Sequence, residues 1–154
     1  MTLHMCENPK NAIIVHNALL ESYLREKYPQ FKVISSTTKC LNIEDTKKEF
    51  DNPNYDLICL NYNLNNNWKF LDSFSSKAIS KCELLCNAIC PPGCPDRLEH
   101  YKRNGEFALN VGKPYKKLPS CFVYLTNDVS ELTRTSSSYI TPEQIFNEYV
   151  PRGF

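Results

Sequence analysis

The chain has 154 residues, enough for one domain with a packed core, and 12% of its residues are aromatic. Its formal net charge is +1 and its basic residues are scattered, which gives no indication of binding to nucleic acid or to a membrane. No apolar run approaches the roughly 20 residues that span a bilayer, and the first residues lack the pattern of a signal peptide. We therefore expect a single cytosolic domain over residues 1–154, whose eight cysteines stay reduced.

The first half of the chain alternates predicted strands with predicted helices. Residues 12–15 (AIIV) are apolar and β-branched, which predicts a strand. Apolar residues at helical spacing over 18–28 predict the helix that follows, and Pro29 ends it. A strand at 31–34 and a short helix at 43–50 repeat the same order.

The second half continues this alternation. It contains predicted strands at 55–60, 82–86 and 121–125 and predicted helices at 67–74, 95–103 and 141–150. The last helix has strong start signals, because Thr141 can act as its N-cap, Pro142 occupies the first helical position and Gln144 completes the spacing of a capping box.

The rhythm of strands and helices predicts an α/β fold. Short, nearly continuous apolar strands are typical of parallel strands buried on both faces, in a doubly wound sheet or a β/α barrel. The chain has only four glycines and no glycine-rich phosphate loop, which favours the barrel. At about 31 residues per unit, the chain supplies about five β/α units of the eight in a barrel. We therefore expect an incomplete parallel β/α barrel, either part of a longer barrel or a domain completed by another chain.

Each predicted strand ends in residues that can form hydrogen bonds. The ends of the strands form the active face of a barrel, so we expect these residues to line a polar substrate site. Turn formation and helix capping, for which Asn, Ser and Thr are favoured, are the alternative explanation. The candidate substrate-binding residues are His16, Asn17, Ser36, Asn61 and Asn87.

Four of the eight cysteines are spaced four residues apart in the segment CELLCNAICPPGC. Cys82 and Cys86 fall in a predicted strand, where we expect them to be small core residues, as we do for Cys6, Cys40 and Cys59. The last two, Cys90 and Cys94, flank a rigid Pro–Pro–Gly turn. Cys94 lies next to the start of a predicted helix, where backbone N–H groups lower the pKa of a thiol.

Two thiolates four residues apart across a turn can converge on a metal. His100 in the following helix and Cys121 at the start of a predicted strand are candidates for further ligands, and Cys86 is another. Three thiolates and a fourth ligand suit an iron–sulfur cluster or a zinc ion. A reduced pair without metal, or a redox-active or nucleophilic thiol, are the alternatives. The sequence identifies no catalytic residue.

The segment LLCNAICPPGCPDRLEHY, with YITPEQIFNEYVPRGF further on, resembles the bacterial collagenase-like peptidases (peptidase family U thirty-two) and their distant β/α-barrel relatives. The resemblance implies the middle portion of a barrel and, as in several members, a 4Fe–4S cluster held by cysteines. Members are assigned roles in RNA base hydroxylation, ubiquinone synthesis and proteolysis. The matching positions are Asn87, Cys90, Cys94–Pro95, Arg97, His100–Tyr101, Pro142–Glu143 and Gly153–Phe154.

Three functions are therefore expected as alternatives. The first is an iron–sulfur or other metal-binding enzyme that modifies RNA or a small molecule. The second is a non-catalytic binding or structural module that a partner chain completes. The third is a peptidase-like hydrolase, in which adjacent strand ends would bring His16 close to Ser35 or Ser36.

Overall fold

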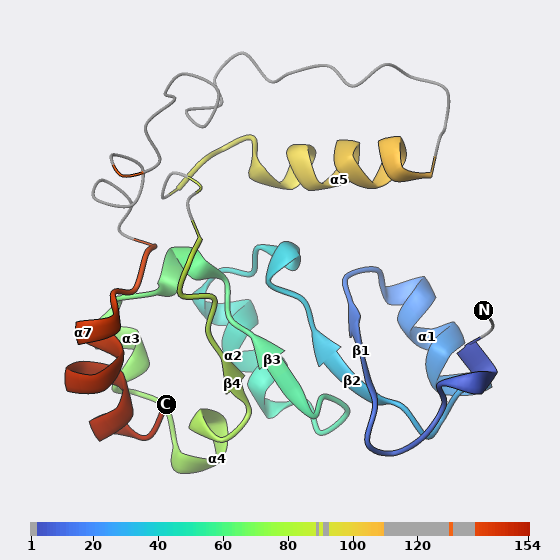
Figure 1. The fold of residues 1–154 in the computed structure, drawn as a ribbon, viewed down its shortest axis with the longest axis horizontal. Helices are drawn as coiled ribbons and strands as arrows, with labels where there is room; N and C mark the ends of the chain where they lie inside the picture. Colours follow the sequence, from blue (N-terminus) through green and yellow to red (C-terminus); the bar gives the residue numbers. More distant parts are fainter. Residues whose placement is uncertain (1–2, 89, 91–92, 110–129, 131–137) are drawn as a thin grey trace.

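The computed structural model describes residues 3–88, 90, 93–109, 130 and 138–154 (Figure 1). At its centre is a parallel sheet of four strands, in the order β1-β2-β3-β4. The strands are β1 (Ala12–Val15), β2 (Lys32–Ser35), β3 (Leu57–Cys59) and β4 (Cys82–Glu83). The predicted α/β fold with parallel strands is thus confirmed, and each strand overlaps the segment predicted for it. The fifth predicted strand, 121–125, lies outside the described residues.

Helices connect successive strands and follow the last one. They are α1 (Ala18–Lys27), α2 (Ile43–Asp51), α3 (Trp68–Leu71), α4 (Ser76–Ile79), α5 (Arg97–Ala108) and α7 (Pro142–Gln144), which continues as a π turn (Ile145–Tyr149) and a 3₁₀ turn (Val150–Arg152). Further 3₁₀ turns occupy Leu3–Met5, Thr37–Lys39 and Tyr62–Leu64. Within the described part of the chain, no helix is long and apolar enough to cross a membrane.

Helices α1 and α2 cover the same face of the sheet. Val15 and Ser35 are register partners on β1 and β2, so their side chains point to the same side. Val15 belongs to the core cluster that contains Leu24 of α1, and Ser35 donates a hydrogen bond to Glu49 of α2. Strands that are neighbours in both sequence and space, joined by right-handed crossovers, place their helices on one face, as in a barrel. The described strands form an open run, so closure into a barrel stays a prediction.

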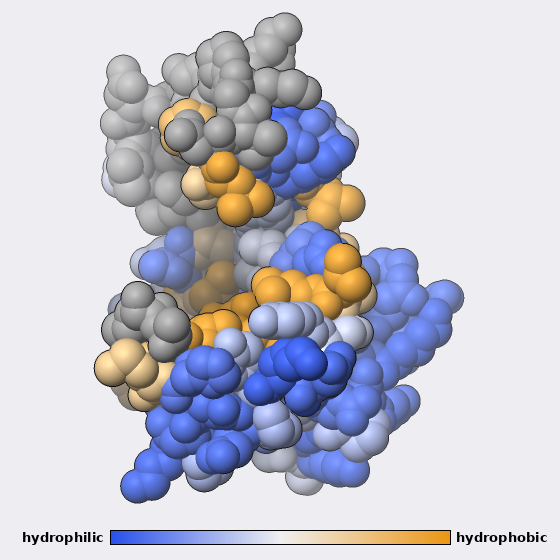
Figure 2. All heavy atoms as spheres, turned by 90° about the vertical axis from the view of Figure 1, so that its right-hand side faces the viewer, coloured by the Kyte–Doolittle hydropathy of each residue, from blue (hydrophilic) through white to orange (hydrophobic). Residues whose placement is uncertain are grey.

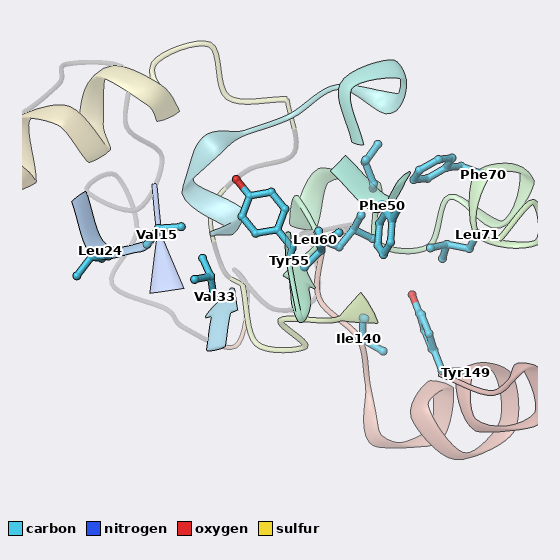
Figure 3. Close-up of a cluster of buried hydrophobic side chains, with 12 residues drawn as sticks. Val15, Leu24, Val33, Phe50, Tyr55, Leu60, Phe70, Leu71, Ile140 and Tyr149 are labelled. Carbon is cyan, nitrogen blue, oxygen red and sulfur yellow. The ribbon is translucent and has the colours of Figure 1, made fainter. Parts of the chain in front are cut away.

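The hydrophobic core lies between this face and its helices (Figure 3). Val33 and Ile58 contribute to it from the centre of the sheet, and each fully buried side chain of this size stabilises the fold by about 1.5–3 kcal/mol. Phe50 of α2 packs on Phe74, with ring centroids 4.7 Å apart, which fastens α2 to the segment after α3. The core therefore orders the strands and the helices on one side of the sheet.

The opposite face of the sheet is open at its β1 end. Ile14 points away from α1 and is 59% exposed, because β1 is an edge strand and α1 covers only the other face. The prediction that the strands are buried on both faces is therefore wrong for β1. It holds for β3, where Ile58 and Cys59 alternate between the two faces and both are buried.

The asparagine-rich segment after β3 fastens the sheet to the C-terminal helix. Asn65 Nδ2 donates to the carbonyl oxygens of Leu85 and Ser138, at 2.9 and 2.7 Å. Asn66 has a left-handed φ of 60°, which asparagine adopts more readily than most residues. Its N–H donates to the hydroxyl of Tyr149 at 2.9 Å, and that hydroxyl donates to Asn66 Oδ1 at 3.0 Å. These asparagines therefore have a structural role.

Candidate functional site

All four strands end at one edge of the sheet because they run parallel, and parallel sheets bind their ligands at this edge. We call it the carboxyl edge and define it as residues 16–17, 36–41, 61–66, 84–88, 90 and 93–101. It comprises the turns after β2 and β3, the loop after β4 and the start of α5. Figure 1 shows α5 lying over these turns, and α5 contacts the turn after β2.

Three of the five candidate substrate-binding residues cap helices or turns. Asn17 caps α1, Ser36 caps the turn after β2 and Asn61 caps the turn after β3, and each side-chain oxygen accepts backbone hydrogen bonds. The capping explanation therefore accounts for these three positions. Asn87 lies exposed beyond β4, and His16 lies exposed after β1. A role in substrate binding stays a prediction for all five.

His16 lies close to hydroxyl groups at the end of the next strand. Its Nδ1 is 3.0 Å from Thr38 Oγ1, which lies 2.7 Å from Ser36 Oγ. Ser35, in contrast, points to the helix-covered face, where it donates to Glu49 at 2.5 Å. The tips of β1 and β2 are thus joined by a chain of one imidazole and two hydroxyl groups. A nucleophile and a base are paired in this way in covalent catalysis.

Three thiols lie near one another at the carboxyl edge, close enough for their charges to interact, and we call Cys40, Cys90 and Cys94 the thiol cluster. Cys40 follows the turn after β2 in a left-handed conformation with φ of 53°. Cys90 and Cys94 belong to the loop that precedes α5. Between them, Gly93 donates its N–H to Asn63 Oδ1 at 3.0 Å, which holds this loop against the turn after β3. The sequence predicted Cys40 in the core, and the structure places it half-buried at this edge instead.

The thiols of the cluster influence one another's pKa values through their charges. Burial raises the pKa of Cys40, the charge of Arg97 lowers it, and the charges of Cys90 and Cys94 raise it. Burial also raises the pKa of Cys94, whereas a hydrogen bond from the Asp96 N–H lowers it. The net shift is upward for both thiols. The expectation of a lowered pKa for Cys94 is therefore wrong, because desolvation outweighs the start of the helix.

Arg97 of α5 is the positive neighbour of the thiol cluster. It is buried, and its guanidinium carbon lies 4.1 Å from the centre of the Tyr62 ring. The hydroxyl groups of Tyr62 and Tyr101 are 2.7 Å apart. Burial and the hydrogen bond with Tyr101 raise the pKa of Tyr62 far above its ordinary value. Both phenols therefore stay protonated beside the guanidinium group.

The donor set falls short of a complete metal site. Among the described residues, no group of three or more His, Cys, Asp or Glu side chains is close enough together to hold a metal ion. Cys121, a predicted ligand, lies outside the described residues, and His100 is half-buried within α5. The thiol cluster supplies at most three sulfur donors, whereas zinc ions and iron–sulfur clusters take four ligands. Metal binding by Cys90, Cys94, Cys121 and His100 thus stays a prediction.

Three other cysteines belong to the core, as predicted. Cys59 is buried on β3, and Cys82 and Cys86 pack against the core cluster. Burial raises the pKa of Cys59 to about 11 and that of Cys82 to about 12. Thiols with such values stay protonated at neutral pH and act as small apolar side chains.

A shallow groove of about 550 Å³ adjoins the thiol cluster at Cys40. Its polar groups include the Glu44 carboxylate and the Asn63 amide, and leucine and isoleucine side chains provide its apolar surface. A ligand in this groove would contact Cys40. The lining residues are Cys40, Leu41, Asn42, Ile43, Glu44, Asn61, Asn63 and Leu64.

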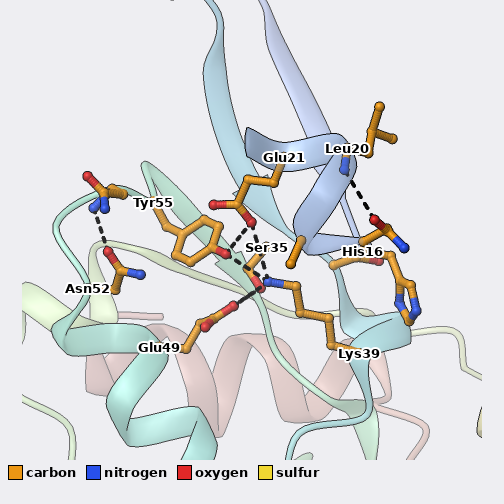
Figure 4. A network of polar contacts seen from close by, with 12 residues as sticks. His16, Leu20, Glu21, Ser35, Lys39, Glu49, Asn52 and Tyr55 are labelled. Atoms are coloured by element: carbon orange, nitrogen blue, oxygen red, sulfur yellow. Dashed lines mark hydrogen bonds and ion pairs between the residues drawn. The ribbon is translucent and has the colours of Figure 1, made fainter. Parts of the chain in front are cut away.

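A second polar cluster lies between α1 and α2 (Figure 4). Lys39 Nζ donates to Glu49 Oε1 at 2.6 Å and to the Tyr55 hydroxyl at 2.8 Å, and Tyr55 donates to Glu21 Oε2 at 2.5 Å. Burial lowers the pKa of Lys39, but its bonds to Glu49 and Tyr55 raise it more. Lys39 therefore stays charged, and this cluster ties the turn before Cys40 to both helices. Sequence reasoning missed it, because its members have no regular spacing.

Comparisons with known proteins give no relative for this chain. No family model, no curated protein and no solved structure matches it. The resemblance to collagenase-like peptidases is therefore neither supported nor contradicted, and it stays a prediction.

Proposed function

We propose that the chain is the thiol-bearing part of a β/α-barrel enzyme that binds a metal and modifies RNA or a small molecule at the carboxyl edge. The observation that carries this proposal is that α5 and the loop before it lie against the turns after β2 and β3, which places Cys40, Cys90 and Cys94 in one region beside the buried Arg97. Separate strand-following segments contribute these residues, which is how active sites of β/α proteins are assembled. The sequence resemblance described above supports the barrel and the modifying activity.

A thiophilic metal is the ligand that the thiol cluster suits best. Sulfur donors select zinc or iron–sulfur clusters over magnesium and calcium. Arg97 acts on Cys40 and Cys94 with a positive charge, and the N–H of Asp96 donates to Cys94, so both would offset the negative charge of bound thiolates. Cys40 would add a third thiolate to the pair predicted from the sequence once the three thiols close on a metal, since in the described structure they are not close enough together to hold one. The fourth ligand is expected from Cys121 or His100. A bound 4Fe–4S cluster would supply electron transfer, and a zinc ion would supply Lewis-acid chemistry.

The groove beside Cys40 is the expected substrate site. Its apolar surface fits the flat part of a small ring, and Glu44 and Asn63 offer an acceptor and a donor at its rim. Asn63 Oδ1 already accepts a hydrogen bond from the N–H of Gly93, in the loop that carries Cys90 and Cys94. A substrate that moves the Asn63 side chain would therefore also change the position of this loop. This shared residue would couple substrate binding to the thiol cluster.

Metal analysis of anaerobically purified protein tests the proposal. We expect iron or zinc in the wild type and a loss of about tenfold or more in Cys90→Ser and in Cys40→Ser. Cys6→Ser, which changes a half-buried thiol outside the carboxyl edge, is the matched control and should keep the metal. A metal-free wild-type protein would contradict the proposal. If Cys90→Ser loses the metal and Cys40→Ser does not, the protein binds a metal but Cys40 is not one of its ligands.

A hydrolase is the second candidate, favoured by the contact of 3.0 Å between His16 Nδ1 and Thr38 Oγ1. In this function His16 would act as the base for the Thr38 hydroxyl, with Ser36 as its neighbour. We expect a fluorophosphonate probe to label the wild type and to label neither Thr38→Val nor His16→Gln. Absence of labelling in the wild type, or equal labelling of all three proteins, would exclude this function.

A further inference from the structure

Helix α1 has an apolar flank that no other described element covers. Leu19 is 81% exposed, and Tyr23, four residues further on the same side, is half exposed. The opposite flank of α1 faces Tyr55 in the turn between α2 and β3, because Glu21 accepts a hydrogen bond from Tyr55 and Arg25 stacks over its ring. The apolar flank therefore faces outward, past the free edge of β1.

The backbone of β1 is unpaired along this edge within the described structure. The carbonyl oxygens of Asn11 and Val15 accept hydrogen bonds from the N–H groups of Lys32 and of Ser36, which follows β2, both at 3.0 Å. Alternate residues of a strand direct their backbone groups to opposite edges, so the N–H and C=O groups of Ala12 and Ile14 point away from β2. The strand AIIV contains no charged residue and no proline, which are the usual means of shielding an edge.

The open face of the sheet carries a matching apolar row. Ile14, Ile34 and Leu57 are register partners on three neighbouring strands and point away from α1 and α2. Ile34 and Leu57 are half-buried and Ile14 is exposed, and because parallel sheets are normally buried on both faces, the β1 end of this row requires a cover. Figure 2, which views the molecule from the α1 side, shows apolar residues gathered in a band on this side of the molecule.

Basic residues lie at the amino ends of β1 and of its neighbour β2. Lys10 precedes β1, and Lys32 opens β2 in register with Ala12. Both are exposed, and neither forms an ion pair with another described residue. A partner that fits this edge would therefore be apolar along its strand and acidic at the amino end of that strand.

We propose that the free edge of β1 and the apolar flank of α1 bind one further β/α unit, a strand parallel to β1 followed by an amphipathic helix. We call the binding site the β1 surface; it consists of Ile14, Leu19, Leu20 and Tyr23. Such a unit would lie beside β1 and α1 in the same way that β1 and α1 lie beside β2 and α2. It would be the first of the additional units that close the sheet into a barrel, whose interior would bury the apolar row. The inference rests on the proposed barrel but is independent of the proposed metal.

A second copy of this chain fits the β1 surface less well. A twofold axis would pair β1 with its own copy in antiparallel orientation. That pairing would cover the flank of α1 but extend the sheet edgewise, so the row of Ile14, Ile34 and Leu57 would stay open. It would also bring Lys10 opposite the residues after β1 of the copy, His16 and Asn17, which supply no negative charge.

Amide hydrogen exchange of the isotope-labelled full chain tests the proposal. The probe is a synthetic β/α peptide with two acidic residues, four β-branched residues, a short turn and an amphipathic helix. We expect saturating peptide to slow exchange of the Ile14 amide by about tenfold or more, because this N–H points to the new strand. The Ile13 amide points to β2 and should not change. Unprotected Ile14 at saturating peptide would overturn the proposal.

Two variants control this experiment. Ile14→Asp combined with Leu19→Asp should abolish protection, whereas Phe146→Asp, which changes a ring 71% exposed on the π turn after α7, should keep it. Circular dichroism shows whether both variants are folded, and unchanged metal content in both separates this result from the metal proposal. Equal loss of protection in both variants would overturn the inference. So would a concentration-dependent dimer in sedimentation equilibrium that only the double variant loses, since a second copy would then be the occupant.

Discussion

The guanidinium carbon of Arg97 lies 4.1 Å from the centre of the Tyr62 ring and joins the first turn of α5 to the turn after β3. Arg97 is only 3% exposed, although it is a charged residue on a helix at the edge of the sheet. Leu98 and Phe107 of the same helix are more than half exposed. Among the described residues, Arg97 and the contact of Tyr101 with Tyr62 therefore help to hold α5 to the sheet.

Replacement of Arg97 by Met should loosen α5. The change keeps the length of the side chain but removes the cation from the Tyr62 ring, and a desolvated contact of this kind contributes about 2 kcal/mol. We expect the free energy of unfolding in urea to fall by about this amount, with faster amide exchange in α5. Arg103→Met is the matched control on the same helix, because Arg103 pairs with Glu99 at the surface, where such pairs contribute little. Equal stability of the two variants would contradict the role of Arg97.

The polar cluster of Glu21, Lys39, Glu49 and Tyr55 should make stability depend on pH in the acidic range. Burial raises the pKa of Glu21, but hydrogen bonds from Tyr55 and Arg25 lower it more, to below its ordinary value of 4.5. A carboxyl group whose pKa is lowered by folding stabilises the protein above its unfolded pKa, and this stabilisation is lost as the pH falls through the folded pKa. We expect the free energy of unfolding to fall between about pH 5 and pH 3 in the wild type.

Glu21→Gln should flatten this pH profile, because the variant has no carboxyl group to protonate at that position. Tyr55→Phe should flatten it in part, since it removes one of the hydrogen bonds that lower the pKa of Glu21. Urea unfolding at a series of pH values measures both effects. Parallel profiles for the wild type and Glu21→Gln would show that the cluster does not favour the ionised carboxylate.

The parallel sheet could be predicted because its strands are short apolar runs between polar tips, as in AIIV before His16. Helix α4 (Ser76–Ile79) could not be predicted, because it spans only four residues without apolar periodicity. The segment 141–150 begins as predicted with its capping box at Thr141. Its continuation as a π turn could not be inferred from local spacing, since it brings Tyr149 to Asn66, far away in the sequence.

The candidate site was harder to predict than the fold. Local spacing identified Cys90 and Cys94, which lie in one loop. Cys40 joins them only because the turn after β2 ends in a left-handed residue and meets α5, and both features depend on tertiary contacts. The same reason explains why Lys39 and Glu21 were missed. In contrast, the sequence alone indicates the capping role of Asn17 as the alternative to substrate binding, because a cap depends only on neighbouring residues.

Asn17 provides a direct test of capping against substrate binding. Its Oδ1 accepts the N–H groups of Leu19 and Leu20 at 2.9 and 3.1 Å, so Asn17→Ala should lower the free energy of unfolding by about 1 kcal/mol. Asn17→Ser should restore most of this loss, because serine caps helices nearly as well. Asn87→Ala changes an exposed asparagine after β4 and should leave stability unchanged. Full stability of Asn17→Ala would remove the capping explanation.

Tyr149 should be the most sensitive link between the C-terminal helix and the sheet. Its hydroxyl accepts from the Asn66 N–H and donates to Asn66 Oδ1, and the variant Tyr149→Phe would leave both groups without this partner. We expect a loss of about 1–3 kcal/mol in urea unfolding at neutral pH. Tyr23→Phe, which removes a half-exposed hydroxyl on α1 that bonds with Tyr28, is the control and should lose clearly less stability than Tyr149→Phe.

The same hydroxyl predicts how stability changes at alkaline pH. Burial raises the pKa of Tyr149 from its ordinary value of 10.0 to about 12. Because folding favours the protonated phenol, its stabilisation is complete below the unfolded pKa and is lost as the pH rises through the folded pKa. The free energy of unfolding of the wild type should therefore fall between pH 10.0 and about 12, more steeply than that of Tyr149→Phe. If the two curves fall in parallel over this range, the Tyr149 hydroxyl is not held in its protonated form by its buried surroundings.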